Sequence, residues 1–169
     1  LDEVLATTGL TKGALYHHFP NKRALGYAVV DEIILSTVEG MWLRPLKNAA
    51  DPLQALVSAI EQLPDLKPPE IIQYGCPLNN LAQEMSPLDE GFRKRLDYIF
   101  RVWHDVTEEA LERAKQQGRI RNDVDCDATA TFVQAALEGC IGIAKNAQSK
   151  ERLRICNHGL IDYIHSLSV

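Results

Sequence analysis

The sequence lacks any apolar run that approaches the roughly 18 residues needed to cross a bilayer. It also lacks a Gly-rich phosphate loop, a nucleophile elbow, a His–carboxylate metal pattern and a Cys-x-x-Cys pair. These are the motifs on which phosphate, acyl-transfer, metal and thiol-redox chemistry usually depend. We therefore predict a protein that is not an enzyme, uses no metal ion or other cofactor, and has no membrane partner.

Cysteine is scarce and scattered. The four residues Cys76, Cys126, Cys140 and Cys156 show no close pairing, which favours a reducing compartment over an oxidised disulfide framework. No cationic segment followed by an apolar run opens the chain, so a signal peptide is not indicated. We expect a cytoplasmic protein with free thiols.

Acidic residues are absent from Val4 to Val30, a stretch that contains Lys12, Lys22 and Arg23. The whole chain of 169 residues has 18 basic and 23 acidic residues and a net charge of −5. The first thirty residues hold three basic and two acidic side chains, a net +1, which leaves −6 for the other 139. A basic end on an acidic body is typical of a protein that binds phosphate with one end.

Alternating runs of β-branched residues are also few, whereas apolar residues recur at spacings of three and four, so we predict an all-α fold. Asn21 is expected to cap a long helix whose buried face holds Leu25, Ala28, Val29, Ile33 and Val38. A helix that opens at Asp51–Pro52 should end before Pro64, which leaves 64–74 as a loop. The capping-box pattern Ser86–Asp89 should launch another long helix, with its apolar stripe at Phe92, Leu96, Ile99, Trp103, Val106, Ala110 and Ala114.

Two short helices separated by a turn at Gly9 predict a helix-turn-helix at the start of the chain. Thr11 can cap the second helix, and Gly13 and Ala14 are small enough to let its backbone approach base edges. Phosphate donors are available from Tyr16, His17, His18 and Lys22. The alternative is a helical hairpin in which Tyr16, His17 and His18 are ordinary surface residues.

The run from Thr8 to Leu25 contains Gly-x-Leu-Tyr-x-His-Phe-x-x-Lys after a Gly-containing turn. It resembles the end of the DNA-binding domain of the tetracycline-repressor (TetR) family. The resemblance implies DNA contacts at Thr11, Lys12, Gly13, Ala14, Tyr16, His17, His18 and Lys22. The family's domain has a further helix before this motif, so we expect residues 1–30 to be a DNA-binding domain whose first helix is missing. Residues 31–169 would then form a larger helical domain that binds an effector and dimerises.

Cys76 stands between Gly75 and Pro77 at a predicted helix N-terminus, where the helix dipole favours a thiolate. A thiolate can react with electrophiles or oxidants, and the TetR-like branch with a similar Gly-Cys segment includes sensors of such molecules. Lys145 is a candidate charge partner for this thiolate. The alternative is that Cys76 is an unreactive, buried small side chain.

An unmodified apolar molecule held among the helices is a second candidate effector. The candidate lining residues are Trp42, Tyr74, Tyr98, Trp103 and Phe132. Aromatic residues at helical spacing usually pack in a core, so each of them could instead be an ordinary core residue.

Small residues predict a dimer contact on the helix Thr129–Ala147. Ala135, Gly139 and Gly142 fall on one side of it, where another helix can approach closely. With the final helix, through Leu160 and Ile164, they would form a four-helix interface with a second copy. Packing within one chain is the alternative.

We therefore expect a homodimeric, ligand-responsive transcriptional repressor that binds a palindromic operator in double-stranded DNA. A small-molecule or electrophile effector would release it by favouring a conformation with wrongly spaced recognition helices. Repression, as opposed to activation, follows from the family resemblance. The alternative function is that of a helical interaction protein that has lost DNA binding.

Overall fold

The computed structural model describes residues 2–9, 11–66 and 70–169. Within these ranges the chain is a succession of helices, and the isolated bridge between Ile120 and Ser168 is the one β pairing. The all-α prediction is therefore confirmed. None of the described helices is both long enough and apolar enough to span a bilayer.

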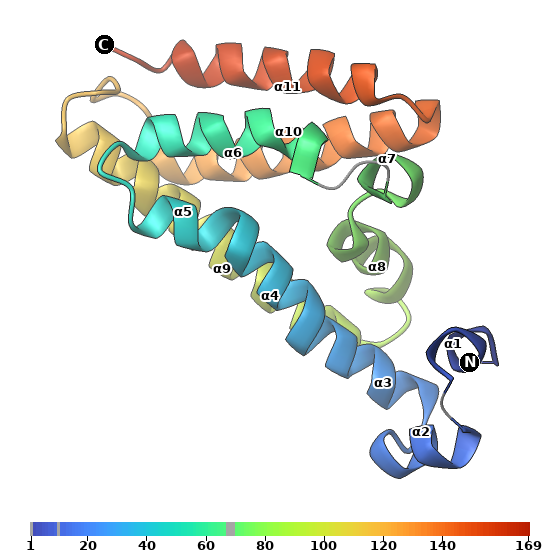
Figure 1. Cartoon of the computed structure of the whole chain (residues 1–169). Helices are drawn as coiled ribbons and strands as arrows, with labels where there is room; N and C mark the ends of the chain where they lie inside the picture. Colours follow the sequence, from blue (N-terminus) through green and yellow to red (C-terminus); the bar gives the residue numbers. More distant parts are fainter. Residues whose placement is uncertain (1, 10, 67–69) are drawn as a thin grey trace.

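The N-terminal part consists of two short helices followed by a long rod. The short helices are α1 (Asp2–Thr8) and α2 (Lys12–His18). The rod, residues 22–47, is a continuous succession of α3 (Lys22–Ala28), η1 (Val29–Ile34), α4 (Leu35–Val38), η2 (Glu39–Leu43) and α5 (Arg44–Lys47). In Figure 1 the rod runs diagonally, with α1 and α2 near its lower end, α9 alongside it, and α6, α10 and α11 above it.

The buried face of the rod repeats every four residues. Its buried side chains are Val30, Ile34, Val38, Trp42 and Leu46, and Leu43 is buried next to Trp42. The expected face was therefore wrong at Val29 and Ile33, and Ile33 is 62% exposed. The reason is that η1 and η2 are π-helical. In a regular α-helix, which has 3.6 residues per turn, side chains spaced by four residues would gradually rotate around the helix axis. The wider turns of the π-helical segments cancel this rotation and keep those side chains on one side of the rod.

Six further helices form the body around α9. They are α6 (Pro52–Leu66), α7 (Glu70–Tyr74), α8 (Pro77–Met85), α9 (Glu90–Gln116), α10 (Cys126–Ala147) and α11 (Lys150–His165). The long helix α9 packs against the rod, α6, α8 and α10, while α11 packs on α6 and α10. All seven residues of the predicted α9 stripe are buried, which confirms that part of the sequence analysis.

Two predicted boundaries differ from the structure. Helix α6 continues through Pro64 to Leu66, and α7 occupies Glu70–Tyr74. The expected loop at 64–74 is therefore wrong at both ends. The residues between, 67–69, lie outside the described ranges. The cap of α9 is Asp89 in place of Ser86, because the Asp89 carboxylate accepts hydrogen bonds from the N–H groups of Gly91 and Phe92. Asn21 caps its helix as predicted, and Asp125 and Ser149 cap α10 and α11.

A disulfide joins α10 and α11 between Cys140 and Cys156, contrary to the expectation of four free cysteines. The chain reverses direction at Gln148, which adopts a left-handed conformation with φ of 48°. The two helices then pack side by side, and the Cα atoms of the two cysteines come within 5.4 Å. Their separation of 16 residues in sequence gave no sign of this proximity. Cys76 and Cys126 are free thiols.

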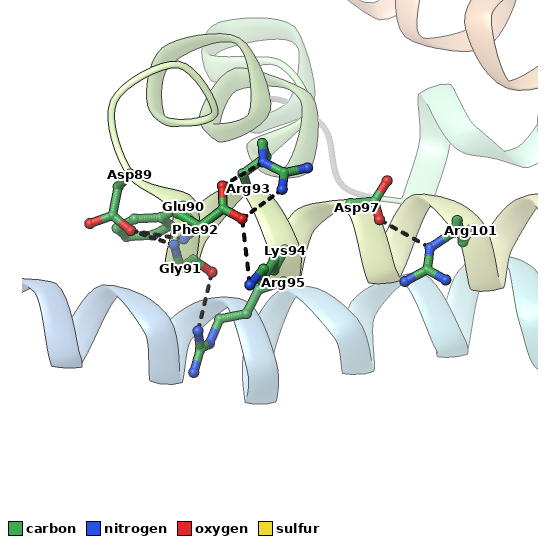
Figure 2. Close-up of polar contacts among 9 residues, drawn as sticks. All are labelled: Asp89, Glu90, Gly91, Phe92, Arg93, Lys94, Arg95, Asp97 and Arg101. Atoms are coloured by element: carbon green, nitrogen blue, oxygen red, sulfur yellow. Dashed lines mark hydrogen bonds and ion pairs between the residues drawn. The ribbon is translucent and has the colours of Figure 1, made fainter.

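The Asp89 carboxylate also joins α9 to the rod. Figure 2 shows this end of α9, where Asp89 Oδ1 accepts from the N–H of Gly91 at 2.8 Å and from that of Phe92 at 3.0 Å. The same oxygen accepts a 2.6 Å hydrogen bond from the hydroxyl of Tyr27 on α3. The guanidinium of Arg95 lies over the Tyr27 ring, 4.1 Å from its centroid, and pairs with Asp31 at 2.9 Å. We call this cluster, Tyr27, Asp31, Asp89, Phe92 and Arg95, the rod junction.

The substitution Tyr27→Phe tests the rod junction through its pH dependence. The Tyr27 hydroxyl is the largest of the contributions that hold the pKa of Asp89 below its ordinary value. A carboxyl with a lowered folded-state pKa stabilises the fold above its unfolded pKa, and this stabilisation is lost as the pH falls through the folded value. Between about pH 5 and about pH 2, the variant should therefore lose less of its stability to acid than the wild type.

The measurement is the urea midpoint of unfolding across that pH range. Tyr98→Phe is the matched control, because Tyr98 is an exposed tyrosine on α9. An identical pH dependence in the wild type and Tyr27→Phe would contradict the role assigned to the Tyr27–Asp89 hydrogen bond.

Candidate functional site

The turn and cap before α2 have the predicted local geometry. Gly9 adopts φ of +67°, a left-handed conformation that glycine reaches without steric cost. The Thr11 hydroxyl accepts a 3.2 Å hydrogen bond from the N–H of Ala14, so Thr11 caps α2 as predicted. Asn21 caps α3 in the same way, accepting from the N–H of Ala24 at 2.9 Å. The two caps fix where α2 begins and where the rod begins.

Helix α2 is attached to the molecule by one buried residue. Leu15 is buried, whereas the eight residues predicted to contact DNA are all exposed: Thr11, Lys12, Gly13, Ala14, Tyr16, His17, His18 and Lys22. Nothing lies within 4 Å of the position that a side chain on Gly13 would occupy. Of the three basic residues in the acid-free stretch, Arg23 faces Asp89 at 3.8 Å. Lys12 and Lys22 are exposed near the two ends of α2, where they can meet phosphates.

A cavity of about 360 Å³ lies between the rod and the helices α7, α8, α9 and α10. This volume is within the roughly 300–1,000 Å³ of small-molecule pockets. Three of the five aromatic residues proposed as lining residues are in its wall, namely Trp42, Tyr74 and Trp103. The indole rings of Trp42 and Trp103 stack with their centroids 5.2 Å apart. Tyr98 and Phe132 are not in the wall, and each is about half exposed.

Cys76 also lines this cavity, and its surroundings favour the alternative of an unreactive thiol over the expected thiolate. Burial and the neighbouring Glu138 carboxylate raise the pKa of the Cys76 thiol to about 12. The N–H groups of Leu78 and Asn79 at the start of α8 do favour the thiolate, as the helix-terminus argument predicts. Their effect is smaller than that of burial and the carboxylate, so Cys76 is a neutral thiol near pH 7.

Lys145 does not pair with Cys76. Its ammonium donates to the side-chain oxygen of Asn80 at 3.0 Å, and its aliphatic stem packs against Gly75. With Tyr74 and Asn80 it borders a separate, open recess beside the cavity. The charged residue that faces Cys76 is instead Glu138.

Glu138 was missed by the sequence analysis. It is 8% exposed, and its Oε2 atom has no hydrogen-bond partner. Burial raises the pKa of this carboxyl, although hydrogen bonds from Cys76 and Asn79 act in the opposite direction. The available signal was that Glu138 is the one carboxylate in the otherwise apolar stretch Thr129–Ala147.

The outer face of α10 and α11 agrees with the dimer prediction in part. Ala135, Gly139 and Gly142 are exposed, but Leu160 and Ile164 are buried inside the chain and cannot face a second copy. Their burial follows from the packing of α11 against α6 and α10. The apolar side chains of this region that remain about half exposed are Phe132, Ile143 and Ile155.

His104, Glu108 and Asp127 bring three possible ligand atoms within 4.8 Å of one another. The ring nitrogens of His104 already have partners, because Nδ1 lies 3.3 Å from the Asp105 carboxylate and Nε2 lies 3.2 Å from that of Asp127. These contacts connect α9 to the start of α10 without an ion. No role in ligand binding is assigned to them.

Comparisons with known families match both parts of the chain. Residues 49–158 match the model described as "Tetracyclin repressor-like, C-terminal domain", and residues 1–29 match "Bacterial regulatory proteins, tetR family". The first match covers α6 to α10 and the first part of α11, and with them the cavity wall apart from its rod residues. The second covers α1, α2 and α3.

Curated relatives are transcriptional regulators of bacteria. The chain is 26% identical over 160 residues to the HTH-type transcriptional repressor DhaR of Mycobacterium sp. (strain GP1), covering 90% of this chain and 75% of that protein. It is 28% identical over 145 residues to the transcriptional regulator AcuR of Cereibacter sphaeroides, covering 86% of this chain and 66% of the relative.

Solved structures share the fold over nearly the whole chain. The regulatory protein TetR from Rhodobacter sphaeroides superposes with a TM-score of 0.86 at 25% identity, covering 99% of this chain and 87% of that one. The reduced form of E. coli NemR superposes with a TM-score of 0.81 at 21% identity, covering 100% and 86%, which shows the likeness of the fold alone. With family models matched over most of its length, the chain belongs to the TetR family of bacterial regulatory proteins.

Proposed function

We propose that the protein is a homodimeric transcriptional repressor that an effector releases from a palindromic operator. The observation that carries the proposal is the exposure of the eight candidate contact residues on and beside α2, around the single buried anchor Leu15. A short capped helix with this composition suits the major groove, and the symmetry of a dimer would place two copies on two half-sites. In this proposal residues 1–30 are the DNA-binding domain and residues 31–169 the effector-binding and dimerisation domain.

The rod connects the proposed DNA-binding helix to the proposed effector cavity. Ile34, Val38 and Trp42 of the rod line the cavity, and three residues separate the end of α2 from the start of the same continuous helix. An effector that fits the cavity best in one position of the rod favours the corresponding position of α2. To convert a population of dimers from almost all able to bind DNA to almost all released, the effector must bind the released conformation roughly 10⁴-fold more tightly than the DNA-binding one.

Of the two proposed effector classes, the cavity favours a molecule that binds without covalent reaction. A thiol whose pKa is about 12 holds very little thiolate near neutral pH, and the thiolate is the reactive form. The cavity in contrast is preformed, has a mostly apolar wall, and contains a few polar groups.

A protein with DNA-bound and released states of this kind would act in the cytoplasm, where its operator is accessible.

DNA binding can be tested by the anisotropy of labelled DNA from the region upstream of the protein's own gene. Saturable, salt-sensitive binding with two protomers per site is expected. The substitution Lys22→Ala should weaken binding to operator and unrelated DNA alike, and should reduce the slope of log affinity against log salt by about 0.9 for each protomer's lost phosphate contact.

Lys47→Ala is the matched control, because Lys47 is an exposed lysine at the other end of the rod. An unchanged salt slope in Lys22→Ala would remove Lys22 from the phosphate contacts. Wild-type affinity for the upstream DNA no greater than for random DNA would favour the alternative, a helical interaction protein that has lost DNA binding.

The proposed dimer contact through α10 can be tested at Gly139. A side chain at this position meets nothing within 4 Å inside the chain, so Gly139→Leu should not disturb the protomer. Leucine should in fact favour the helix by about 0.8 kcal/mol over glycine. In a close helix–helix contact between two copies, however, the added side chain should weaken the dimer roughly ten- to a hundredfold.

Sedimentation equilibrium measures the dimer dissociation constant, and circular dichroism confirms the helix content. Gly40→Leu provides the control, since Gly40 is an exposed helical glycine on the rod with the same open surroundings. A Gly139→Leu protein that dimerises as tightly as the wild type would place the dimer contact elsewhere.

A further inference from the structure

We propose that the effector is a small apolar amine whose ammonium group is bound by the Glu138 carboxylate at the polar end of the cavity. The inference rests on the proposed function, because it names the chemical class of the effector for the same cavity. It is carried by the charges that line the cavity, by an unpartnered buried carboxylate oxygen, and by the aromatic wall.

The charged groups in the cavity wall are all acidic. Glu70 and Glu138 line it, and none of the described lining residues is Lys, Arg or His. Lys145 borders the separate recess, and its ammonium is bound to Asn80. A negatively charged ligand would therefore meet two carboxylates and no compensating cation, whereas an ammonium group would meet attraction from both.

Glu138 has an unused acceptor beside the cavity. Its side chain lines the cavity wall, and its Oε2 atom is buried with no hydrogen-bond partner, so a turn of the carboxylate toward the cavity would offer this oxygen to a ligand. Leaving a buried carboxylate oxygen without a donor is costly, and the cost is recovered when a ligand supplies that donor. An ammonium group brings up to three N–H donors and the opposite charge, so it forms hydrogen bonds roughly twice as strong as those of a neutral donor.

The remaining wall suits the apolar part of such a molecule. Trp42 and Trp103 present stacked indole rings, and aliphatic side chains from the rod and α10 complete the surface: Ile34, Val38, Leu137 and Ile141. Indole faces attract cations as well as apolar groups. A ligand with an aromatic or branched aliphatic body and one amino group therefore matches both the apolar wall and the carboxylate of this cavity of about 360 Å³.

The elevated pKa of the Glu138 carboxyl is consistent with a missing cation. Burial in an apolar wall disfavours the charged carboxylate, and the partners present, Cys76 and Asn79, are neutral donors that compensate in part. A bound ammonium would supply the positive charge that this environment lacks.

The test compares three probes that differ in the group facing Glu138. They are 2-phenylethylamine, 2-phenylethanol and 3-phenylpropanoate, which present an ammonium, a neutral hydroxyl and a carboxylate on similar bodies. Quenching of intrinsic tryptophan fluorescence reports binding directly, because the chain has two tryptophans and both line the cavity. The titrations are made near pH 7 on the full chain without DNA, so their outcome does not depend on operator binding.

The amine is expected to bind at least about tenfold more tightly than the alcohol, and the carboxylate more weakly than either. Glu138→Gln keeps the shape of the side chain but removes its charge. It should lower the affinity for the amine by about tenfold and change that for the alcohol by no more than about threefold. Glu84→Gln, an exposed glutamate of α8, is the matched control and should behave as the wild type.

A second variant, Glu70→Gln, removes the other carboxylate of the wall and should cause a smaller loss of affinity for the amine. It keeps the test valid if Glu138→Gln does not fold.

Four outcomes would each overturn the proposal: equal affinities for the amine and the alcohol, tighter binding of the carboxylate, an amine affinity unchanged by Glu138→Gln, or no quenching by any probe. Amine binding by a chain that fails to bind DNA would refute the repressor function and leave the amine site at Glu138 standing.

Discussion

The Asp89 carboxylate is the interaction on which the arrangement of the N-terminal helices depends. One oxygen accepts from the Tyr27 hydroxyl and from two N–H groups at the start of α9, while the other faces Arg23 of the rod. Helix capping and the attachment of the rod are thus performed by the same group. A rod held only by apolar packing could slide along α9, whereas this hydrogen-bonded end sets its axial position. Movement of α2 relative to the body must therefore bend the rod or break the rod junction.

The rod itself shows where periodicity stops being informative. Sequence analysis predicted the helix, its Asn21 cap and the buried Val38, but placed Val29 and Ile33 inside. The error arises because a 3.6-residue period assumes regular α-helical turns, and the π turns in η1 and η2 are decided by packing against α9. Their effect is functional in the proposed mechanism. They keep Ile34, Val38 and Trp42 in line along one side, and these are the buried rod residues of the cavity wall, which Ile33, Thr37 and Met41 also line.

Local features of the candidate site were predictable, and features that depend on distant residues were not. The Thr11 cap, the Gly9 turn and the burial of Leu15 lie within a few residues of one another, so the sequence around α2 was sufficient. At Cys76 the local signal, a helix N-terminus, was read correctly but was outweighed by burial and by Glu138, which stands 62 residues later in the chain. The same limit applies to the Cys140–Cys156 disulfide and to Lys145, whose partner is Asn80.

Helix α10 joins the two activities proposed for the body. Leu137, Glu138 and Ile141 line the cavity, while Ala135, Gly139 and Gly142 lie on the exposed side and border a neighbouring recess that Glu138 also lines. A charge bound at Glu138 therefore acts on the helix that carries the proposed dimer contact. The glycines on that face allow a second helix to approach closely. They have no side chains that could rearrange, so a tilt of α10 would also move the helix of the second copy that packs against it. The dimer contact then becomes part of the response to the effector, because operator spacing depends on how the two copies are oriented.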